Sequence, residues 1–135
     1  MAELTFFFDR CFGTGLPKWL KGIKTPFDIE FHDDKKHGFK DETPDDEWLA
    51  AVGKRKWVVL SHDKRFHKDS MAMEAVKQHK VACFYVDGGS LTSWGKLVLF
   101  CRCYIRIRTI VKETKAPYIY RVTHRGTVIL VKGGW

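Results

Sequence analysis

The sequence lacks the features that mark membrane, secreted and low-complexity proteins. No apolar run reaches the roughly 18 residues that a helical membrane span needs. The first nine residues carry two acids, Glu3 and Asp9, and no basic side chain, which is not typical of a signal peptide. Internal repeats and low-complexity segments are also absent. We therefore expect a cytoplasmic protein without membrane association, whose 135 residues fold as a single domain, residues 1–135.

Cysteine is scarce and wrongly spaced for a disulfide framework or a four-cysteine zinc site. The four cysteines stand at positions 11, 83, 101 and 103 and form no C-x-x-C pair. Cys101 and Cys103 point to different sides if the segment around them is helical. We predict reduced, mostly buried thiols.

Charge of both signs is present, but the two signs are separated along the chain. Residues 1–53 contain 11 Asp or Glu and 7 Lys or Arg, a net charge of −4. Residues 54–135 contain 5 Asp or Glu and 17 Lys or Arg, a net charge of +12. A basic surface attracts a phosphate backbone, and acids bind phosphate through divalent cations. This pattern fits a nucleic-acid-binding protein and two ordinary solvated charged faces about equally well.

Short apolar runs alternate with helical patterns along most of the chain. The sequence predicts strands at 4–8, 27–31, 57–60 and 81–86, and helices at 16–21, 43–53, 70–79 and 92–112. This alternation predicts an α/β fold, a three-layer α/β/α sandwich on a mostly parallel sheet. Residues 118–122 and 127–131 predict a β-hairpin, so that residues 115–135 form a C-terminal appendage. For the long helix, the predicted stripe consists of Leu97, Cys101, Tyr104, Arg108 and Val111.

Three aspartates fall at the ends of predicted elements. Asp9 follows three phenylalanines, Asp63 follows the third strand, and Asp45 opens the helix at 43–53 on its apolar face. Because the carboxyl ends of parallel strands meet at one edge, we expect these acids to converge there, with Asp46 and Glu47 as second-rank candidates. Converging carboxylates suit Mg²⁺ or Mn²⁺ and metal-assisted hydrolysis of a phosphodiester. Singly, each acid has a structural alternative, namely a helix dipole, a turn cap or an ion pair.

Two segments resemble a known family. The run TPDDEWLAAVGKRKWVVLSHDKRF, residues 43–66, resembles the closing half of a PIN-domain nuclease active site, and FFFDR near the start resembles the first strand and leading aspartate of that family. The resemblance covers about the first 90 residues and is closest to the short branch related to VapC toxins. It implies an endoribonuclease dependent on Mg²⁺ or Mn²⁺, the toxin of a type II toxin–antitoxin pair, with Asp9, Asp45 and Asp63 as catalytic metal ligands.

The sequence departs from the family pattern at three points. Ser61 replaces the usual threonine, and Arg65 stands where a second aspartate is common. The early helix at 16–21 contains no acid, whereas the family usually has a glutamate there. Asp33, Asp34 and Glu47 are the candidate substitutes, and Glu47 is the one that we add to the predicted metal ligands. If none of them serves, the site is reduced, and it binds nucleic acid but catalyses weakly.

Basic side chains provide candidate contacts with RNA, with DNA as the alternative substrate. The predicted contacts are Arg10, Lys54, Arg55, Lys64, Arg65, Arg102 and Arg106. An antitoxin protein is the expected partner, and a homodimer is left open. The rival hypothesis is a catalytically weak or inactive module on the same fold that binds nucleic acid or protein, with structural acids. The missing fourth acid favours that rival.

Overall fold

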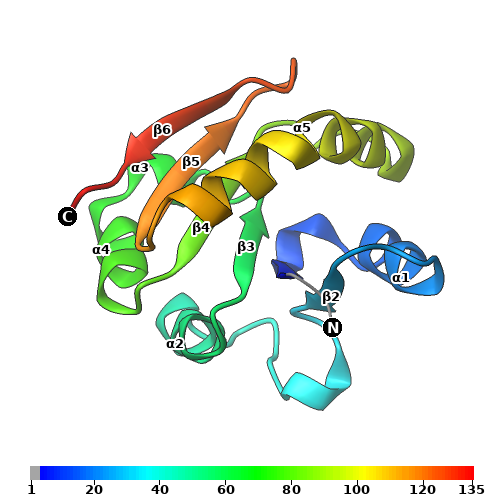
Figure 1. The fold of residues 1–135 in the computed structure, drawn as a ribbon. Coiled ribbons are helices and arrows are strands. Elements are labelled where there is room, and N and C mark those ends of the chain that lie inside the picture. Colours follow the sequence, from blue (N-terminus) through cyan, green and yellow to red (C-terminus); the bar gives the residue numbers. More distant parts are fainter. Residues whose placement is uncertain (1–3) are drawn as a thin grey trace.

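A six-stranded sheet forms the centre of the molecule. The structure is a computed structural model, and it describes residues 4–135. The strands are β1 (Thr5–Phe8), β2 (Asp28–Phe31), β3 (Val58–Ser61), β4 (Ala82–Val86), β5 (Tyr118–Val122) and β6 (Val128–Lys132). The helices are α1 (Gly15–Gly22), α2 (Asp45–Arg55), α3 (Arg65–Lys68), α4 (Ser70–Gln78) and α5 (Ser93–Glu113), with 3₁₀ turns at Arg10–Phe12 and Lys35–His37. Figure 1 shows this arrangement.

The sheet is parallel except at its last strand. The strand order is β2-β1-β3-β4-β5-β6, and only β6 runs antiparallel to its neighbour. The predicted α/β fold class and the C-terminal hairpin are therefore confirmed. The first strand of the hairpin, β5, pairs in parallel with β4 over its whole length. The hairpin thus continues the main sheet and contributes its own strand end to the same edge as β1, β3 and β4.

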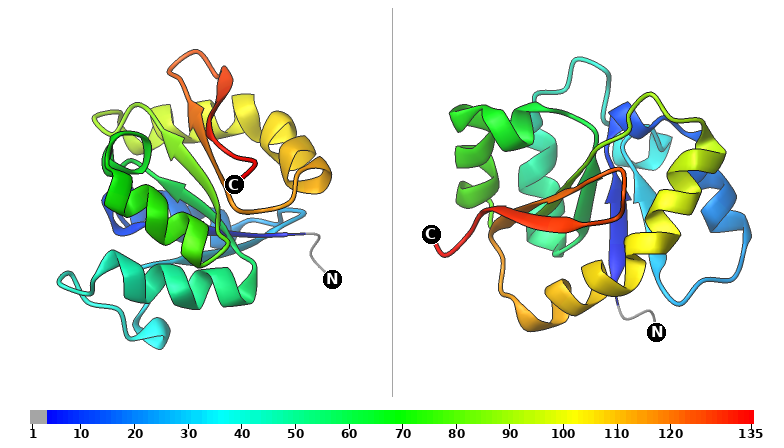
Figure 2. Two further views of the ribbon diagram at one scale, coloured as in Figure 1. Left: turned by 90° about the vertical axis from the view of Figure 1, so that its left-hand side faces the viewer. Right: turned by 90° about the horizontal axis from the view of Figure 1, so that it is seen from above.

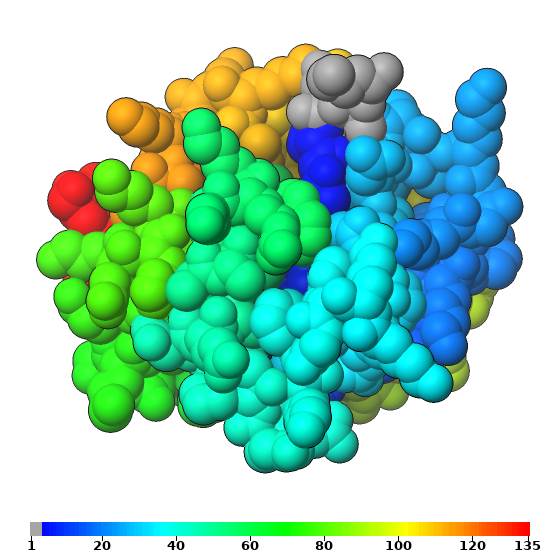
Figure 3. Space-filling model, turned by 90° about the horizontal axis from the view of Figure 1, so that it is seen from below, coloured from blue at the N-terminus to red at the C-terminus, as the bar shows by residue number. Residues whose placement is uncertain are grey.

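Helices cover both faces of the sheet, as the two views in Figure 2 show. Successive side chains of a strand point to opposite faces, so the run of phenylalanines in β1 serves two cores. Phe6 and Phe8 pack in the core under α1 and α5, whereas Phe7 packs in the other core, under α2 and α4. In that second core Phe7 stacks on Trp48, with ring centroids 5.5 Å apart. Figure 3 shows the outer face of this helical layer, where α2 and α4 lie side by side.

The buried stripe of α5 differs from the predicted one. The buried residues are Leu99, Phe100, Cys103, Ile107 and Ile110. The predicted stripe lies beside the buried one: Leu97, Tyr104 and Val111 pack partly buried against the core, and Cys101 is exposed. Apolar residues occur around most of this helix, and Trp94 and Ile105 are exposed on its outer side. A helix without one clear polar face does not define its buried side by sequence alone. Despite this apolar character, no helix within residues 4–135 meets the length and hydropathy needed to cross a membrane.

The cysteines are free, as predicted, but only half of them are buried. Cys83 and Cys103 lie in the two cores, whereas Cys11 and Cys101 are exposed. The prediction of mostly buried thiols was therefore wrong for two positions. Cys101 is exposed because it stands two residues, about 200° of helical turn, from the buried Cys103.

Candidate active site

The three predicted acids gather at the carboxyl edge of the sheet, where β1, β3, β4 and β5 end. Asp9 follows the last residue of β1, Asp63 lies two residues beyond β3, and Asp45 is the first residue of α2. Asp9 is linked through the hydroxyl of Ser61 to the backbone of Asp63, and Arg65 joins Asp63 to Asp45. We call Asp9, Asp45 and Asp63 the acid cluster.

Asp9 is the buried member of the cluster, with 6% of its surface exposed. Its Oδ1 accepts a hydrogen bond from the backbone N–H of Arg10 at 2.6 Å, and its Oδ2 accepts one from Ser61 Oγ at 2.7 Å. Burial raises the pKa of Asp9, and the charge of Asp45 adds to that rise, although both hydrogen bonds oppose it. The ionised carboxylate of Asp9 is therefore less stable than one at the surface, and a nearby cation would stabilise it.

Ser61 determines how the ends of β1 and β3 meet. Its hydroxyl donates to Asp9, and its oxygen accepts the backbone N–H of Asp63 at 3.0 Å. Ser61 is fully buried at the last position of β3. The serine that replaces the family's usual threonine thus supplies the hydroxyl that orients an aspartate.

Arg65 supplies a positive charge inside the cluster. Its Nη2 lies 2.6 Å from Asp45 Oδ2 and 2.6 Å from Asp63 Oδ2, and its Nε lies 3.0 Å from Asp63 Oδ2. Burial alone would raise the pKa of Asp63, but the hydrogen bonds and charge of Arg65 hold that pKa below its usual value. The other oxygen of Asp45 accepts from the indole N–H of Trp48 at 3.0 Å. Asp45 and Asp63 therefore share one guanidinium nitrogen, and the cation between these two carboxylates is the side chain of Arg65.

Cys11 and His62 line the same edge but are not prepared for nucleophilic chemistry. Although Cys11 is exposed as a residue, its sulfur atom lies against Ser61 Oγ and the backbone N–H of His62, and burial of the thiol there raises its pKa to about 12, so the thiol stays protonated. Burial lowers the pKa of His62 to about 4, so its ring is neutral at neutral pH. The ring stacks on Phe12 at 3.8 Å, and its Nδ1 lies 2.7 Å from the carbonyl oxygen of Val86. These contacts indicate a packing role for His62 and argue against a cysteine–histidine hydrolase.

The proposed substitutes for the missing acid lie outside the cluster. Glu47 is exposed on α2, and within the described residues no hydrogen bond or ion pair joins it to the acid cluster. Asp34 accepts from the backbone N–H of Lys36 at the start of a 3₁₀ turn, and Asp33 contacts His32. Asp46 contacts His79 at 2.7 Å. The acid cluster therefore contains three carboxylates, and the guanidinium of Arg65 lies between two of them.

A second group of possible metal ligands lies beside β2. Among residues 4–135, the group whose three ligand atoms all lie within 4.8 Å of one another is Glu30, Asp34 and His37, and not the acid cluster. The ammonium of Lys36 lies 2.9 Å from Glu30 Oε1, so a protein cation already neutralises this group. The turn at Lys35–His37 brings Glu30 and His37 together, and no local sequence pattern indicated this contact.

The predicted nucleic-acid contacts divide between different parts of the surface. Arg10, Lys64 and Arg65 lie at the carboxyl edge, although Arg65 faces the acids and Arg10 lies 4.0 Å from Asp41. Arg102 and Arg106 are exposed on α5. Lys54 and Arg55 end α2 at the opposite edge of the sheet, which we call the amino edge. The structure therefore does not bring these seven residues onto one surface.

Sequence reasoning missed a third acid at a strand end. Asp87 follows β4 directly, and its side chain accepts two hydrogen bonds from Arg121 of β5, at 3.0 and 3.1 Å. The rule that selected Asp9 and Asp63, an acid within two residues of the end of a buried strand, selects Asp87 as well. The sequence did not indicate that β5 lies beside β4, and this pairing is what brings Arg121 to Asp87.

The family assignment follows from a comparison of the sequence with known protein families. A family model described as a PIN like domain matches residues 4–88, which is more than half of the chain. The chain therefore belongs to the PIN-like domain family, and the predicted resemblance is confirmed at that level. Members of this family are typically nucleases that use divalent metal ions. Searches of curated proteins and of solved structures found no match.

Proposed function

We propose that this chain is a divalent-metal-dependent endoribonuclease with the acid cluster as its catalytic centre. The observation that carries the proposal is the convergence of Asp9, Asp45 and Asp63, from three separate elements, on one edge of the sheet. Membership of a nuclease-type family supports it. The basic second half of the chain supplies the charge that attracts an RNA backbone.

The acid cluster fits a hard cation by its chemistry. Carboxylate oxygens are preferred ligands of Mg²⁺ and Mn²⁺, and the guanidinium of Arg65 shows that Asp45 and Asp63 accept a shared positive charge. When bound, such an ion would supply an activated water molecule and neutralise charge on the scissile phosphate. The chain's own contribution is orientation, because Ser61 fixes Asp9 and Trp48 fixes Asp45.

The finer assignments belong to the same proposal. We infer a toxin of the VapC-related branch, acting on RNA in the cytoplasm and inhibited by an antitoxin protein. An unregulated ribonuclease damages its host, which is the reason for expecting such an inhibitor. Arg65 illustrates how the inhibitor would act, because a basic side chain among these acids neutralises them. Glu47 is the weakest of the proposed ligands, since it is exposed on α2.

The direct test is cleavage of single-stranded RNA in the presence of Mn²⁺ or Mg²⁺. We expect Asp9→Asn and Asp63→Asn to lower the cleavage rate by about 10³-fold, because each removes a charged ligand that is worth several kcal/mol to the reaction. Glu74→Gln, an exposed change on α4, is the matched control and should cleave at the wild-type rate. Cleavage by the Asp9→Asn protein at the wild-type rate would contradict the proposal.

One observation favours the rival function, a catalytically weak or inactive module that binds nucleic acid or protein. Arg65 occupies the position between Asp45 and Asp63, and α1 supplies no acid of its own. If the rival is correct, the purified wild-type protein binds RNA without cleaving it in either metal. Asp9→Asn would then leave RNA binding unchanged.

A further inference from the structure

A basic cavity lies at the carboxyl edge beside the acid cluster. It has a volume of about 430 Å³ and opens where β3, β4 and β5 end. Its charged side chains are Lys64, Lys68, Arg121 and Asp87, and three histidines, His62, His67 and His124, also line it. We call this cavity the basic pocket. The segment from Ser61 to Phe66 separates the two sites, with Asp63 and Arg65 facing the acid cluster and Lys64 lining the basic pocket.

Two side chains of the basic pocket are already held in place. Both polar arms of Arg121 bind Asp87, at 3.1 Å from Nε and 3.0 Å from Nη2, and Asp87 is 7% exposed. The His67 ring stacks on Tyr85, with centroids 4.2 Å apart. A guanidinium and a ring that are fixed before binding lose little conformational entropy when a ligand arrives.

The pocket has an excess of positive charge. Asp87 is the one carboxylate among its lining residues, against the cationic side chains of Lys64, Lys68 and Arg121. Burial lowers the pKa of His67, and the positive charges of Arg121, Lys68 and Lys64 lower it further. An anion in this cavity would relieve that repulsion.

We propose that the basic pocket is a phosphate-binding subsite, which holds one phosphate group of a nucleic-acid strand while a neighbouring phosphate faces the acid cluster. The proposal rests on the proposed nuclease function for the identity of the strand. Phosphate is the chemical class because a positioned guanidinium and two flexible lysines together suit a tetrahedral anion with several acceptor oxygens. A nucleic acid is the source because residues 63 to 65 place the two sites next to each other.

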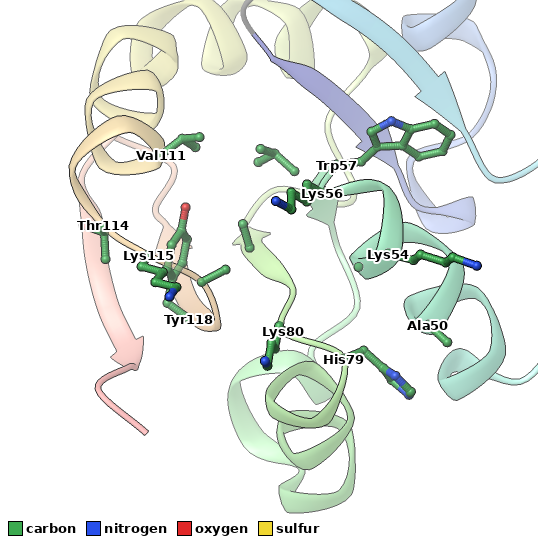
Figure 4. A pocket seen from close by; sticks show the side chains of 14 residues that line it. Ala50, Lys54, Lys56, Trp57, His79, Lys80, Val111, Thr114, Lys115 and Tyr118 are labelled. Carbon is green, nitrogen blue, oxygen red and sulfur yellow. The ribbon is translucent and has the colours of Figure 1, made fainter.

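The larger cavity of the molecule lacks these properties. It has a volume of about 600 Å³, lies at the amino edge, and is lined by Lys54, Lys56, Lys80 and Lys115. Figure 4 shows Lys56, Lys80 and Lys115 around the hollow, whereas Lys54 points away from it. These lysines are exposed, and the lining residues include no carboxylate that would fix them. Two of them therefore provide a charge-matched control.

The test is binding of single-stranded RNA by the metal-free protein in EDTA, measured by fluorescence anisotropy. We expect Lys64→Gln/Lys68→Gln to raise Kd about tenfold and to reduce the slope of log K against log salt by about 0.7, since the pocket holds one phosphate and each phosphate contact on a single strand contributes about 0.7. Lys80→Gln/Lys115→Gln removes the same charge from the amino edge and should change Kd by less than about twofold. Equal weakening by both double variants would overturn the proposal, and so would no weakening by the first.

Two RNA probes identify the source of the phosphate. A strand with a 5′-phosphate that binds more tightly than its 5′-hydroxyl counterpart, with the difference lost in Lys64→Gln/Lys68→Gln, assigns the pocket to a terminal phosphate. Equal binding of the two probes, with both weakened by the double variant, assigns it to an internal phosphodiester. Either outcome supports a phosphate subsite.

A second double variant controls for the possibility that the lysine substitutions weaken binding by unfolding the protein. Arg121→Gln/Asp87→Asn removes the fixed guanidinium and its acid together, so that no buried charge is left unpaired. It should weaken RNA binding as the lysine pair does, with an unchanged thermal melt. The binding assay needs neither metal nor cleavage, so it tests the phosphate subsite separately from the proposed nuclease activity. Cleavage without an effect of Lys64→Gln/Lys68→Gln rejects the subsite alone.

Discussion

The two edges of the sheet organise charge in opposite ways. At the carboxyl edge Asp9 and Asp87 are nearly buried, and each is held by named partners, the hydroxyl of Ser61 and the guanidinium of Arg121. At the amino edge the cavity is larger, but its lysines are exposed and its lining contains no carboxylate. Both edges have the same strands and the same helical layers above and below them.

If the proposed function is correct, fixed and buried charge marks the functional edge better than cavity size does. A buried carboxylate costs free energy unless it is hydrogen-bonded or paired, so the fold retains several of them only where they are satisfied together. An exposed lysine carries almost no such cost. The carboxyl edge therefore concentrates groups that stability alone does not require.

The largest change in metal affinity at the carboxyl edge is expected from removing the guanidinium at the acid cluster. Arg65→Gln should tighten Mn²⁺ binding about tenfold, because the ion no longer competes with a cation held at 2.6 Å from both Asp45 and Asp63. Calorimetric titration with Mn²⁺ measures the change.

The matched control for this change is Arg125→Gln, in the exposed turn between β5 and β6. It removes the same charge from an exposed turn, without touching the contacts that Arg65 makes with Asp45 and Asp63, and should leave Mn²⁺ affinity within about twofold of wild type. Weaker Mn²⁺ binding by Arg65→Gln would show that the arginine organises the cluster instead of competing with the ion.

Much of the carboxyl edge could be predicted because its signals are local. An acid at or within two residues of the end of a buried strand is visible in the sequence, and parallel strands necessarily end at one edge. Asp9 and Asp63 were found in this way, and helix geometry placed Asp45 on the inward face of α2 beside Trp48. The α/β class followed from the alternation of elements.

What sequence could not provide was long-range pairing and side-chain direction. The link between Asp87 and Arg121 depends on β5 lying beside β4, which are separated by the whole of α5. Arg65 was predicted to face RNA, and the structure instead turns it toward two acids through several rotatable bonds. Neither the partner of a strand nor the rotamer of a long side chain is encoded by a local pattern.

A smaller effect is expected from pH at the carboxyl edge. Because the pKa of His62 falls from 6.5 to about 4 on folding, only the unfolded chain binds a proton at this residue between those values. The free energy of unfolding is therefore unaffected above pH 6.5 and decreases as the pH falls toward 4. With allowance for partial exposure of the ring, we expect a loss of about 1 kcal/mol at pH 5.

His62→Gln isolates this contribution, because the variant lacks the titrating ring. Its melting temperature should fall less between pH 7 and pH 5 than that of the wild type, measured in metal-free buffer. His124→Gln replaces an exposed histidine and should follow the wild-type curve. Parallel pH profiles for wild type and His62→Gln would show that the buried ring does not control acid stability.

The central claim, that the acid cluster is a metal site, is tested most directly by thermal melting during a Mn²⁺ titration of the wild type and Asp9→Asn. Binding to the folded state should stabilise the wild type by about 1.4 kcal/mol when free metal is ten times Kd, and Asp9→Asn should not respond. An equal rise in both proteins would place the ion elsewhere, for example at Glu30, Asp34 and His37. No rise in either protein at millimolar Mn²⁺ would contradict the metal-dependent function.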